Sequence, residues 1–489
     1  MLKQLPAQTQ DTQQAKRNNR NNQRNLLPFF WLLLGAYITF ATFKTYSSQV
    51  IGAEDIFGAF SISLASLLSV YLWCAGKVFG IPIFPLFSVT YLWTCAIPLL
   101  SENPSVFAYS TSERFSASMT VTGFLLLSTL IWYQFVNKFP QPKNYYRTLE
   151  IKKGDRIFLG ILFLGNLYIV LTLANWLSID IGSFSLIRGA ILGLTAIATF
   201  AMSYRFGTNK LSRNNKVLYL ILIASNLIIN AISLLLVSSL TLFLITIVGY
   251  SLGKGKFPWI STVIVFSLFT LLHAGKAPIR ELYWQQPIAP WQYPSRYIEW
   301  IDFGINRLFS KEEDKSESEQ SILERASVFQ QLLLTQSSTE KGFPLLDGYT
   351  YALIPQLLVP RILNSEKITS HEGTSILNIY YGRQTRNDTQ STTIGWGLLA
   401  ESYANYGLWG CGLLASICGA GYGYISLLSI NAPVFSDRYL FAILILSYAL
   451  QTEFTAGVYV AALFQSTVTL FVFVFFFMKV QKIKDIQES

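Results

Sequence analysis

The sequence predicts an all-α protein that crosses a membrane about twelve times, with one large extracytoplasmic loop between helices 9 and 10. Of its 489 residues, 52% are hydrophobic and only 13% are charged, whereas a soluble domain carries about 25% charged residues. The apolar residues also form continuous blocks of about 17 to 25 residues, the length that crosses a bilayer as a helix. Together these features indicate a polytopic helical membrane protein.

The chain begins with a polar tail, residues 1–26, which is rich in Gln and Asn and is typical of a disordered cytoplasmic segment. The first apolar block is long for a signal peptide and lacks a small-x-small cleavage site, so we expect a retained helix. Nine blocks fill residues 27–273, three more fill 404–479, and 480–489 form a second cytoplasmic tail. The expected helices span 27–43, 56–75, 80–100, 117–136, 157–175, 184–203, 217–236, 238–253, 257–273, 404–429, 439–455 and 459–479.

Basic residues are unevenly distributed between the two sets of loops. On one side they are frequent, whereas the short loops on the other side, before residue 274, hold only Lys44 and Arg114. Basic loops remain in the cytoplasm, so both termini are expected inside and residues 274–403 outside, in a bacterial inner membrane. The same bias accounts for the net charge of +10, so we expect no nucleic-acid partner. Membrane lipid is the expected partner of the apolar surface.

The sequence offers no support for a metal or a cofactor. The four cysteines, Cys74, Cys95, Cys411 and Cys418, lie in apolar blocks and form no C-x-x-C pair, so we expect buried thiols and no zinc site. Walker A, H-E-x-x-H and G-x-S-x-G patterns are absent from the large loop. We therefore expect metal-independent chemistry.

Three ionisable residues lie within or beside expected helices: Arg188 in the sixth, Glu401 before the tenth and Glu453 in the eleventh. Such residues are costly in a membrane and often mark function. For Arg188 and Glu453 the alternative is a structural role, in which they snorkel to the interface or pair with each other. All three lie toward the expected outer face, as do Arg280 and Glu281. Because guanidinium groups bind phosphate oxygens through parallel hydrogen bonds, this face suits a lipid-linked phosphate or diphosphate.

The large loop adds further candidates. Its aromatic residues between 283 and 300 suit either sugar stacking or the membrane interface. Residues 321–334 carry apolar side chains at helical spacing, which predicts an amphipathic helix that holds Glu324 and Arg325. His371 lies in a polar stretch, where simple solvent exposure is the alternative to a chemical role.

Three segments resemble the O-antigen-polymerase-like (Wzy-type) proteins and the related O-antigen ligases. They are Gly348-Tyr349-Thr350-Tyr351, the pair Pro360-Arg361 with Ser365-Glu366-Lys367, and Glu401 to Gly407 within 397–410. Proteins of this superfamily have ten to fourteen spanning helices and one large outer loop late in the chain. The sequence has no histidine in a motif context, which departs from what the ligases lead one to expect.

The resemblance implies a membrane glycosyltransferase that acts on glycans linked to a polyprenyl diphosphate, as both donor and acceptor, and so lengthens a surface or exopolysaccharide. A flippase and a chain-length regulator are implied partners. Cations must stabilise the leaving diphosphate and a base must accept the proton of the acceptor. The expected catalytic residues are Glu401, Arg361 and Arg188, and the expected substrate-binding residues are Arg280, Arg325, Glu324, His371, Tyr349 and Tyr351.

Three alternatives remain open at this stage. An O-antigen ligase-type glycan transferase would differ only in its acceptor. A transporter or flippase of lipid-linked sugars would need ionisable residues along a central path. A membrane acyltransferase would need a histidine near a lipid cavity, for which His273 is the candidate.

Overall fold

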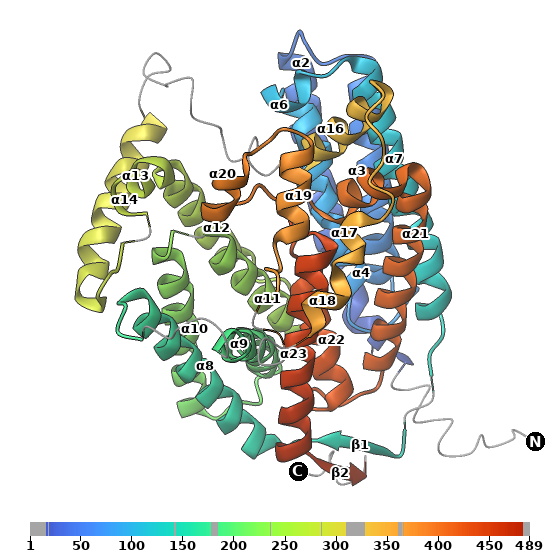
Figure 1. Cartoon of the computed structure of the whole chain (residues 1–489). Helices are drawn as coiled ribbons and strands as arrows, with labels where there is room; N and C mark the ends of the chain where they lie inside the picture. Colours follow the sequence, from blue (N-terminus) through green and yellow to red (C-terminus); the bar gives the residue numbers. More distant parts are fainter. Residues whose placement is uncertain are drawn as a thin grey trace, which may run out of the picture. The chain divides into compact units, whose positions relative to one another are not determined.

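Long helices make up most of the chain in the computed structural model (Figure 1). The structure describes residues 16–17, 19–140, 143–177, 184–234, 236–284, 286–309, 328–359, 364 and 366–482. Within these ranges nine helices are long and apolar enough to cross a membrane, and counting the bent pair α12–α13 as one span gives ten. An all-α, multi-pass membrane protein is therefore confirmed, with fewer spans among the described residues than the twelve expected.

The chain divides into two units, each with its own packing. The first unit comprises Met1–Asn144, Leu323–Ala432 and Leu444–Val468, and the second comprises Tyr145–Ile322, Pro433–Ile443 and Thr469–Ser489. The large loop is thus divided between them, since its described residues up to Phe309 group with the second unit and those from Val328 onward with the first.

The first unit is built around α7, which packs against α3 and α21. A capping box starts α7, because Ser110 accepts a hydrogen bond from the Glu113 amide and its own amide donates to the Glu113 carboxylate. Gly419 allows α21 to approach α7 closely, since a Cβ there would lie 2.6 Å from the Ser128 carbonyl oxygen. The elements that lie wholly in the first unit are α2 (Leu27–Ser47), α3 (Ala53–Cys74), α4 (Ile83–Tyr91), the π-helix η1 (Leu92–Ala96), α5 (Ile97–Leu100), α6 (Pro104–Phe107), α7 (Thr111–Val136), α16 (Phe329–Glu340), α17 (Tyr349–Ala352), α18 (Ile354–Leu358), α19 (Glu372–Tyr380), α20 (Arg386–Ser391) and α21 (Leu398–Ser429).

In the second unit, α9 packs against α8 and α11. A two-stranded antiparallel ribbon pairs β1 with β2, so that Tyr145 lies opposite Lys482. The sequence analysis did not anticipate this ribbon, because its strands are more than 300 residues apart. The elements are β1 (Tyr145–Thr148), α8 (Ile151–Leu173), α9 (Phe184–Gly207), α10 (Arg213–Ile232), α11 (Leu236–Lys254), α12 (Trp259–Ala274), α13 (Lys276–Tyr283), the 3-10 helix η2 (Pro290–Gln292), α14 (Tyr293–Phe309) and β2 (Lys479–Lys482).

Several expected elements differ in the structure. The expected helix 439–455 ends early: α22 (Asp437–Ala449) has 13 residues, which is about 20 Å of helix and less than the ~30 Å core of a bilayer. Glu453 consequently lies outside any helix, exposed in the connection to α23 (Ala456–Phe477). The placement of Glu453 within a spanning helix is therefore wrong.

The helix expected at 321–334 also differs. Residues 321–327 lie outside the described ranges, and α16 begins at Phe329 and continues to Glu340. Its buried residues include the polar Gln331 and Gln336 as well as Leu332 and Leu333. A helix that contacts both α7 and α21 is a packed part of the first unit and does not lie with one face in water.

Each unit contains a buried ion pair that the sequence analysis missed. In the first, Arg114 Nε and Nη2 donate to Asp55 Oδ1 and Oδ2 at 2.7 and 2.8 Å. In the second, Arg205 Nε and Nη2 donate to Asp155 Oδ1 and Oδ2 at 2.9 and 2.8 Å. Arg114, which the sequence analysis counted as a residue of an outer loop, therefore lies in the first turn of α7 and is buried.

The expected orientation can be tested with engineered thiols, because all four native cysteines are buried. Lys341 and Lys256 are both exposed and lie in connections on opposite sides of the predicted topology. A membrane-impermeant maleimide is expected to label Lys341→Cys in spheroplasts, and to label Lys256→Cys only after permeabilisation. The reverse pattern would show that the orientation is inverted.

Candidate functional site

Two of the segments that carry the family resemblance meet at the side chain of Glu401, in the first turn of α21. The carboxylate has no exposed surface. Its Oε1 accepts a hydrogen bond from Thr350 Oγ1 at 2.9 Å, and its Oε2 accepts one from the backbone amide of Ala456 at 2.5 Å. One side chain thus connects α17, α21 and the beginning of α23 within the first unit.

Asn405 extends this cluster by one helical turn. Its Nδ2 donates to Thr350 Oγ1 at 2.8 Å and to the Glu401 carbonyl oxygen at 2.8 Å. The Thr350 hydroxyl therefore accepts from Asn405 while it donates to Glu401, which fixes its orientation. The Asn405 Oδ1 atom is buried and has no hydrogen-bond partner among the described residues. A buried acceptor without a donor is costly, so this atom is suited to a further donor at the site.

α21 is broken immediately after Asn405. Tyr406 and Gly407 leave the helical conformation, and Gly407 has φ +59° and ψ −144°, a region that is essentially restricted to glycine. The break separates a short segment that holds Glu401 and Asn405 from the longer remainder of the helix. Broken helices in membranes occur where irregular backbone is enclosed by protein or lines a cavity.

The Gly348-Tyr-Thr-Tyr segment packs against this break in α21. Tyr351 and Tyr406 stack with ring centroids 6.1 Å apart. Gly348 has φ +85°, and a Cβ on it would overlap the Tyr406 hydroxyl, so only glycine fits there. Burial, reinforced by the nearby Glu401 carboxylate, raises the pKa of Tyr351. Its phenol therefore stays protonated at neutral pH and can donate a hydrogen bond.

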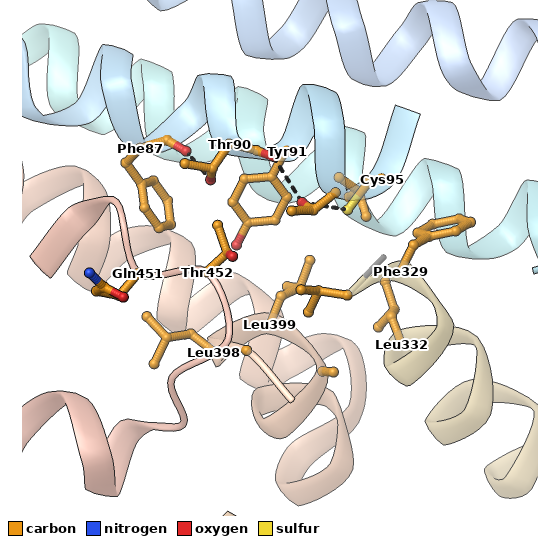
Figure 2. Close-up of a pocket in the computed structure, with 15 residues that line it drawn as sticks. Phe87, Thr90, Tyr91, Cys95, Phe329, Leu332, Leu398, Leu399, Gln451 and Thr452 are labelled. Carbon is orange, nitrogen blue, oxygen red and sulfur yellow. Dashed lines mark hydrogen bonds between the residues drawn. The ribbon is translucent and has the colours of Figure 1, made fainter. Parts of the chain in front are cut away.

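A small cavity adjoins the Glu401 segment in the first unit (Figure 2). Ala400 lines it from α21 and Thr452 from the connection after α22, while the Tyr91 side chain projects into it from α4. Its volume of about 30 Å³ holds about two water molecules. The cavity is too small for a sugar ring. It can hold only water molecules next to the Glu401 segment.

Comparison of the chain with models of known protein families, with curated proteins and with solved structures found no match. Among the residues that the structure describes, no group of three or more His, Cys, Asp or Glu side chains is arranged to hold a metal ion.

The other expected residues of the first unit lie at varying distance from Glu401. Tyr349 is exposed, next to the buried Thr350, and His371 is exposed immediately before α19. The start of α19 reaches the site, because a Cβ on Gly373 would lie 4.0 Å from Glu401 Oε1. Arg361, Arg325 and Glu324 lie outside the described residues, so their roles remain predictions.

Arg188 and Arg280 belong to the second unit. The backbone of Arg188 lies in α9. Arg280 donates from Nε and Nη2 to the Leu234 carbonyl oxygen at 3.2 and 2.9 Å, and its guanidinium lies 4.1 Å from the centre of the Trp284 ring. Arg280 thus stabilises the turn between α10 and α11, where Leu234 has φ +62°. A convergence of these arginines with Glu401 remains a prediction.

Sequence reasoning identified Glu401 and Tyr351 but missed Thr350, Asn405 and the Ala456 amide. The spacing of Glu401 and Asn405 was a usable signal, because residues four apart share a face of a helix. No local pattern connects Thr350 to Glu401, which lies 51 residues later. The Ala456 amide acts through its backbone, so its side chain gives no indication of the contact.

Proposed function

We propose that the chain is a membrane glycosyltransferase that joins polyprenyl-diphosphate-linked oligosaccharide repeat units at the outer face of the membrane, with Glu401 as the base. The observation that carries the proposal is the hydrogen bond from the Thr350 hydroxyl to the buried Glu401 carboxylate. It joins two segments that were singled out for their resemblance to one superfamily. It also presents a hydroxyl to a carboxylate, which is the contact that sugar transfer to a hydroxyl requires.

In this proposal the Thr350 hydroxyl occupies the position of the acceptor's hydroxyl. When the acceptor replaces it, the acceptor's proton passes to Glu401 and its oxygen bonds to the anomeric carbon of the donor. The bond between that carbon and the diphosphate oxygen breaks, and the electron pair leaves with the lipid diphosphate. Asn405, which donates to Thr350, would hold the acceptor oxygen. Its Oδ1, which has no partner among the described residues, would accept from a neighbouring sugar hydroxyl.

The substrate must displace α17 to reach the carboxylate, because Glu401 is fully buried. This segment has only four residues and is anchored to the site through Thr350. The leaving diphosphate carries negative charge that cations must offset. Arg361 is our candidate for this role from the first unit, with Arg188 and Arg280 as further candidates.

A transporter of lipid-linked sugars is the second candidate, because two interrupted helices contact each other in the first unit. The α4–η1–α5 helix contains a π segment at Leu92–Ala96, and it packs against the broken α21. Interrupted helices at a central site are typical of secondary transporters. They are equally suited to an enclosed catalytic site, so the distinction requires a functional measurement.

The two candidates predict different products in cells. Deletion of the gene is expected to leave single repeat units at the outer face of the membrane, measured by mass spectrometry of surface glycans, and the wild-type gene should restore long polymer. Repeat units that stay on the cytoplasmic side would instead identify a transporter. Unchanged polymer length after deletion would refute the proposed function.

A further inference from the structure

The second unit contains a cavity much larger than the one that adjoins the Glu401 segment. It has a volume of about 310 Å³ and lies where the ends of α8 and α10 meet the segment after α13. This volume is at the lower end of the range for ligand pockets, about 300 to 1,000 Å³. The cavity is therefore large enough for one ring-sized ligand. The charge bias of the sequence assigns these helix ends to the outer side of the membrane.

The walls of this cavity are held by hydrogen bonds within the unit. The Ile288 amide donates to the Leu173 carbonyl oxygen at 2.8 Å, which fixes the segment after α13 against the end of α8. The Arg280 guanidinium donates to the carbonyl oxygen of Leu234, another lining residue. Both helix ends turn sharply, with φ +56° at Asn175 and φ +62° at Leu234. The cavity is thus formed before any ligand arrives, as is usual for small-molecule sites.

Arg296 supplies the strongest donor in the lining. Its guanidinium lies 3.4 Å from the centre of the Tyr283 ring and makes no hydrogen bond within the described part of the chain. Burial lowers the pKa of Arg296, and the nearby Tyr283 and Glu299 offset part of this effect. A planar guanidinium that is fixed on a ring presents two parallel N–H donors. The carboxamides of Asn175 and Gln286 line the same space and add both donors and acceptors.

The charge around the cavity favours a neutral ligand. Glu299 accepts a hydrogen bond from the Tyr283 hydroxyl at 2.9 Å and attracts Arg296 electrostatically, so one cation is offset by one carboxylate. Arg280 is already bound to the Leu234 carbonyl. A diphosphate, which carries several negative charges, would need more unopposed cations than this lining offers. Two adjacent hydroxyl groups of a sugar match the parallel donors of Arg296 without added charge.

We infer that this cavity binds one neutral sugar ring of the glycan substrate, with Arg296 donating to two adjacent hydroxyl groups. The inference rests on the proposed function for the source of the sugar, and assigns a sugar subsite to the second unit. Two exposed tryptophans, Trp176 and Trp291, lie 5.7 Å apart, and Trp176 directly follows the lining residue Asn175. Their ring faces offer apolar surface for the next sugar of the chain.

The test measures binding alone, with the full-length protein in detergent. The probe is a set of short oligosaccharides released by mild acid from the host's own exopolysaccharide, titrated by calorimetry. Arg296→Gln is expected to raise the Kd at least about tenfold, because it removes charge-assisted hydrogen bonds. Arg307→Gln, on the same helix but outside the lining, should leave the Kd unchanged. Inorganic diphosphate should not compete.

A second variant distinguishes a loss of binding from a loss of folding. Thr172→Phe changes an exposed lining residue and places an aromatic ring in the cavity while leaving Arg296 intact, so it should also weaken binding in a protein that remains monodisperse. An unchanged Kd in both variants, or competition by diphosphate, would overturn the inference. Because binding is measured without turnover, the two proposals can fail separately. A wild-type protein that binds the oligosaccharides but forms no polymer would refute the proposed function and leave the sugar site standing.

Discussion

Replacement of Glu401 by Gln is expected to lower the rate of polymer formation by about 10² to 10⁴-fold, the usual contribution of a general base. The amide has nearly the same shape as the carboxylate and can keep both contacts. Its oxygen can accept from the Ala456 amide and its NH₂ group can donate to the Thr350 hydroxyl, which rotates. The fold should therefore survive while the proton acceptor is lost.

Thr350→Val separates this role from a purely structural one. If Glu401 served only to anchor α17, Thr350→Val, which removes the anchoring hydrogen bond, would reduce the rate at least as much as Glu401→Gln, which can keep it. In the proposed mechanism the acceptor replaces Thr350, so Thr350→Val should lower the rate about tenfold or less. Glu372→Gln, which alters a carboxylate in a surface ion pair with Arg386, is the matched control and should retain the wild-type rate. Equal losses for Glu401→Gln and Thr350→Val would assign Glu401 a positioning role.

Asp55→Ala is expected to destabilise the first unit by about 3–5 kcal/mol, because it leaves the buried Arg114 charge without its partner. Arg114 makes two hydrogen bonds to Asp55, a third to the Tyr109 carbonyl at 2.5 Å, and lies 4.3 Å from the centre of the Phe107 ring. These contacts hold it in place after the carboxylate is removed. The uncompensated charge then remains buried.

The stability prediction can be measured by the heat-induced reaction of a thiol dye with the cysteines, which are all buried in the folded protein. Asp55→Ala should react at a clearly lower temperature than wild type. Glu54→Ala removes the neighbouring exposed carboxylate and should behave as wild type. The double variant Asp55→Ala, Arg114→Met should recover part of the loss, because it removes both charges. Equal transitions for Asp55→Ala and Glu54→Ala would show that the ion pair does not stabilise the fold.

The fold class followed from the sequence because long apolar blocks have few alternatives to spanning helices. The helix expected at 439–455 ends at Ala449, just before the polar run Gln451-Thr452-Glu453, a signal that the expected span overlooked. Asp55 and Asp155 resembled ordinary charges at helix ends, because their burial depends on arginines 59 and 50 residues away. The β1–β2 ribbon depends on pairing between distant segments and has no local signature.

The candidate site was predictable in part. Glu401 was singled out because an ionisable residue beside a spanning helix is rare, and the tyrosines of Gly348-Tyr-Thr-Tyr because of the resemblance. The Thr350 contact was not predictable, since it depends on how the loop folds back over α21. The glycine at the end of the Glu401–Gly407 segment is explained only once the φ of +59° at Gly407 is known.

Reconstitution of the purified chain in liposomes with polyprenyl-diphosphate-linked repeat units tests the central claim most directly. The wild-type protein alone should convert them into a ladder of longer lipid-linked glycans, resolved by gel electrophoresis. The Glu401→Gln protein should yield almost none, although it incorporates into the liposomes equally well. Failure of the wild-type protein to lengthen the glycan, or equal ladders from both proteins, would contradict the account.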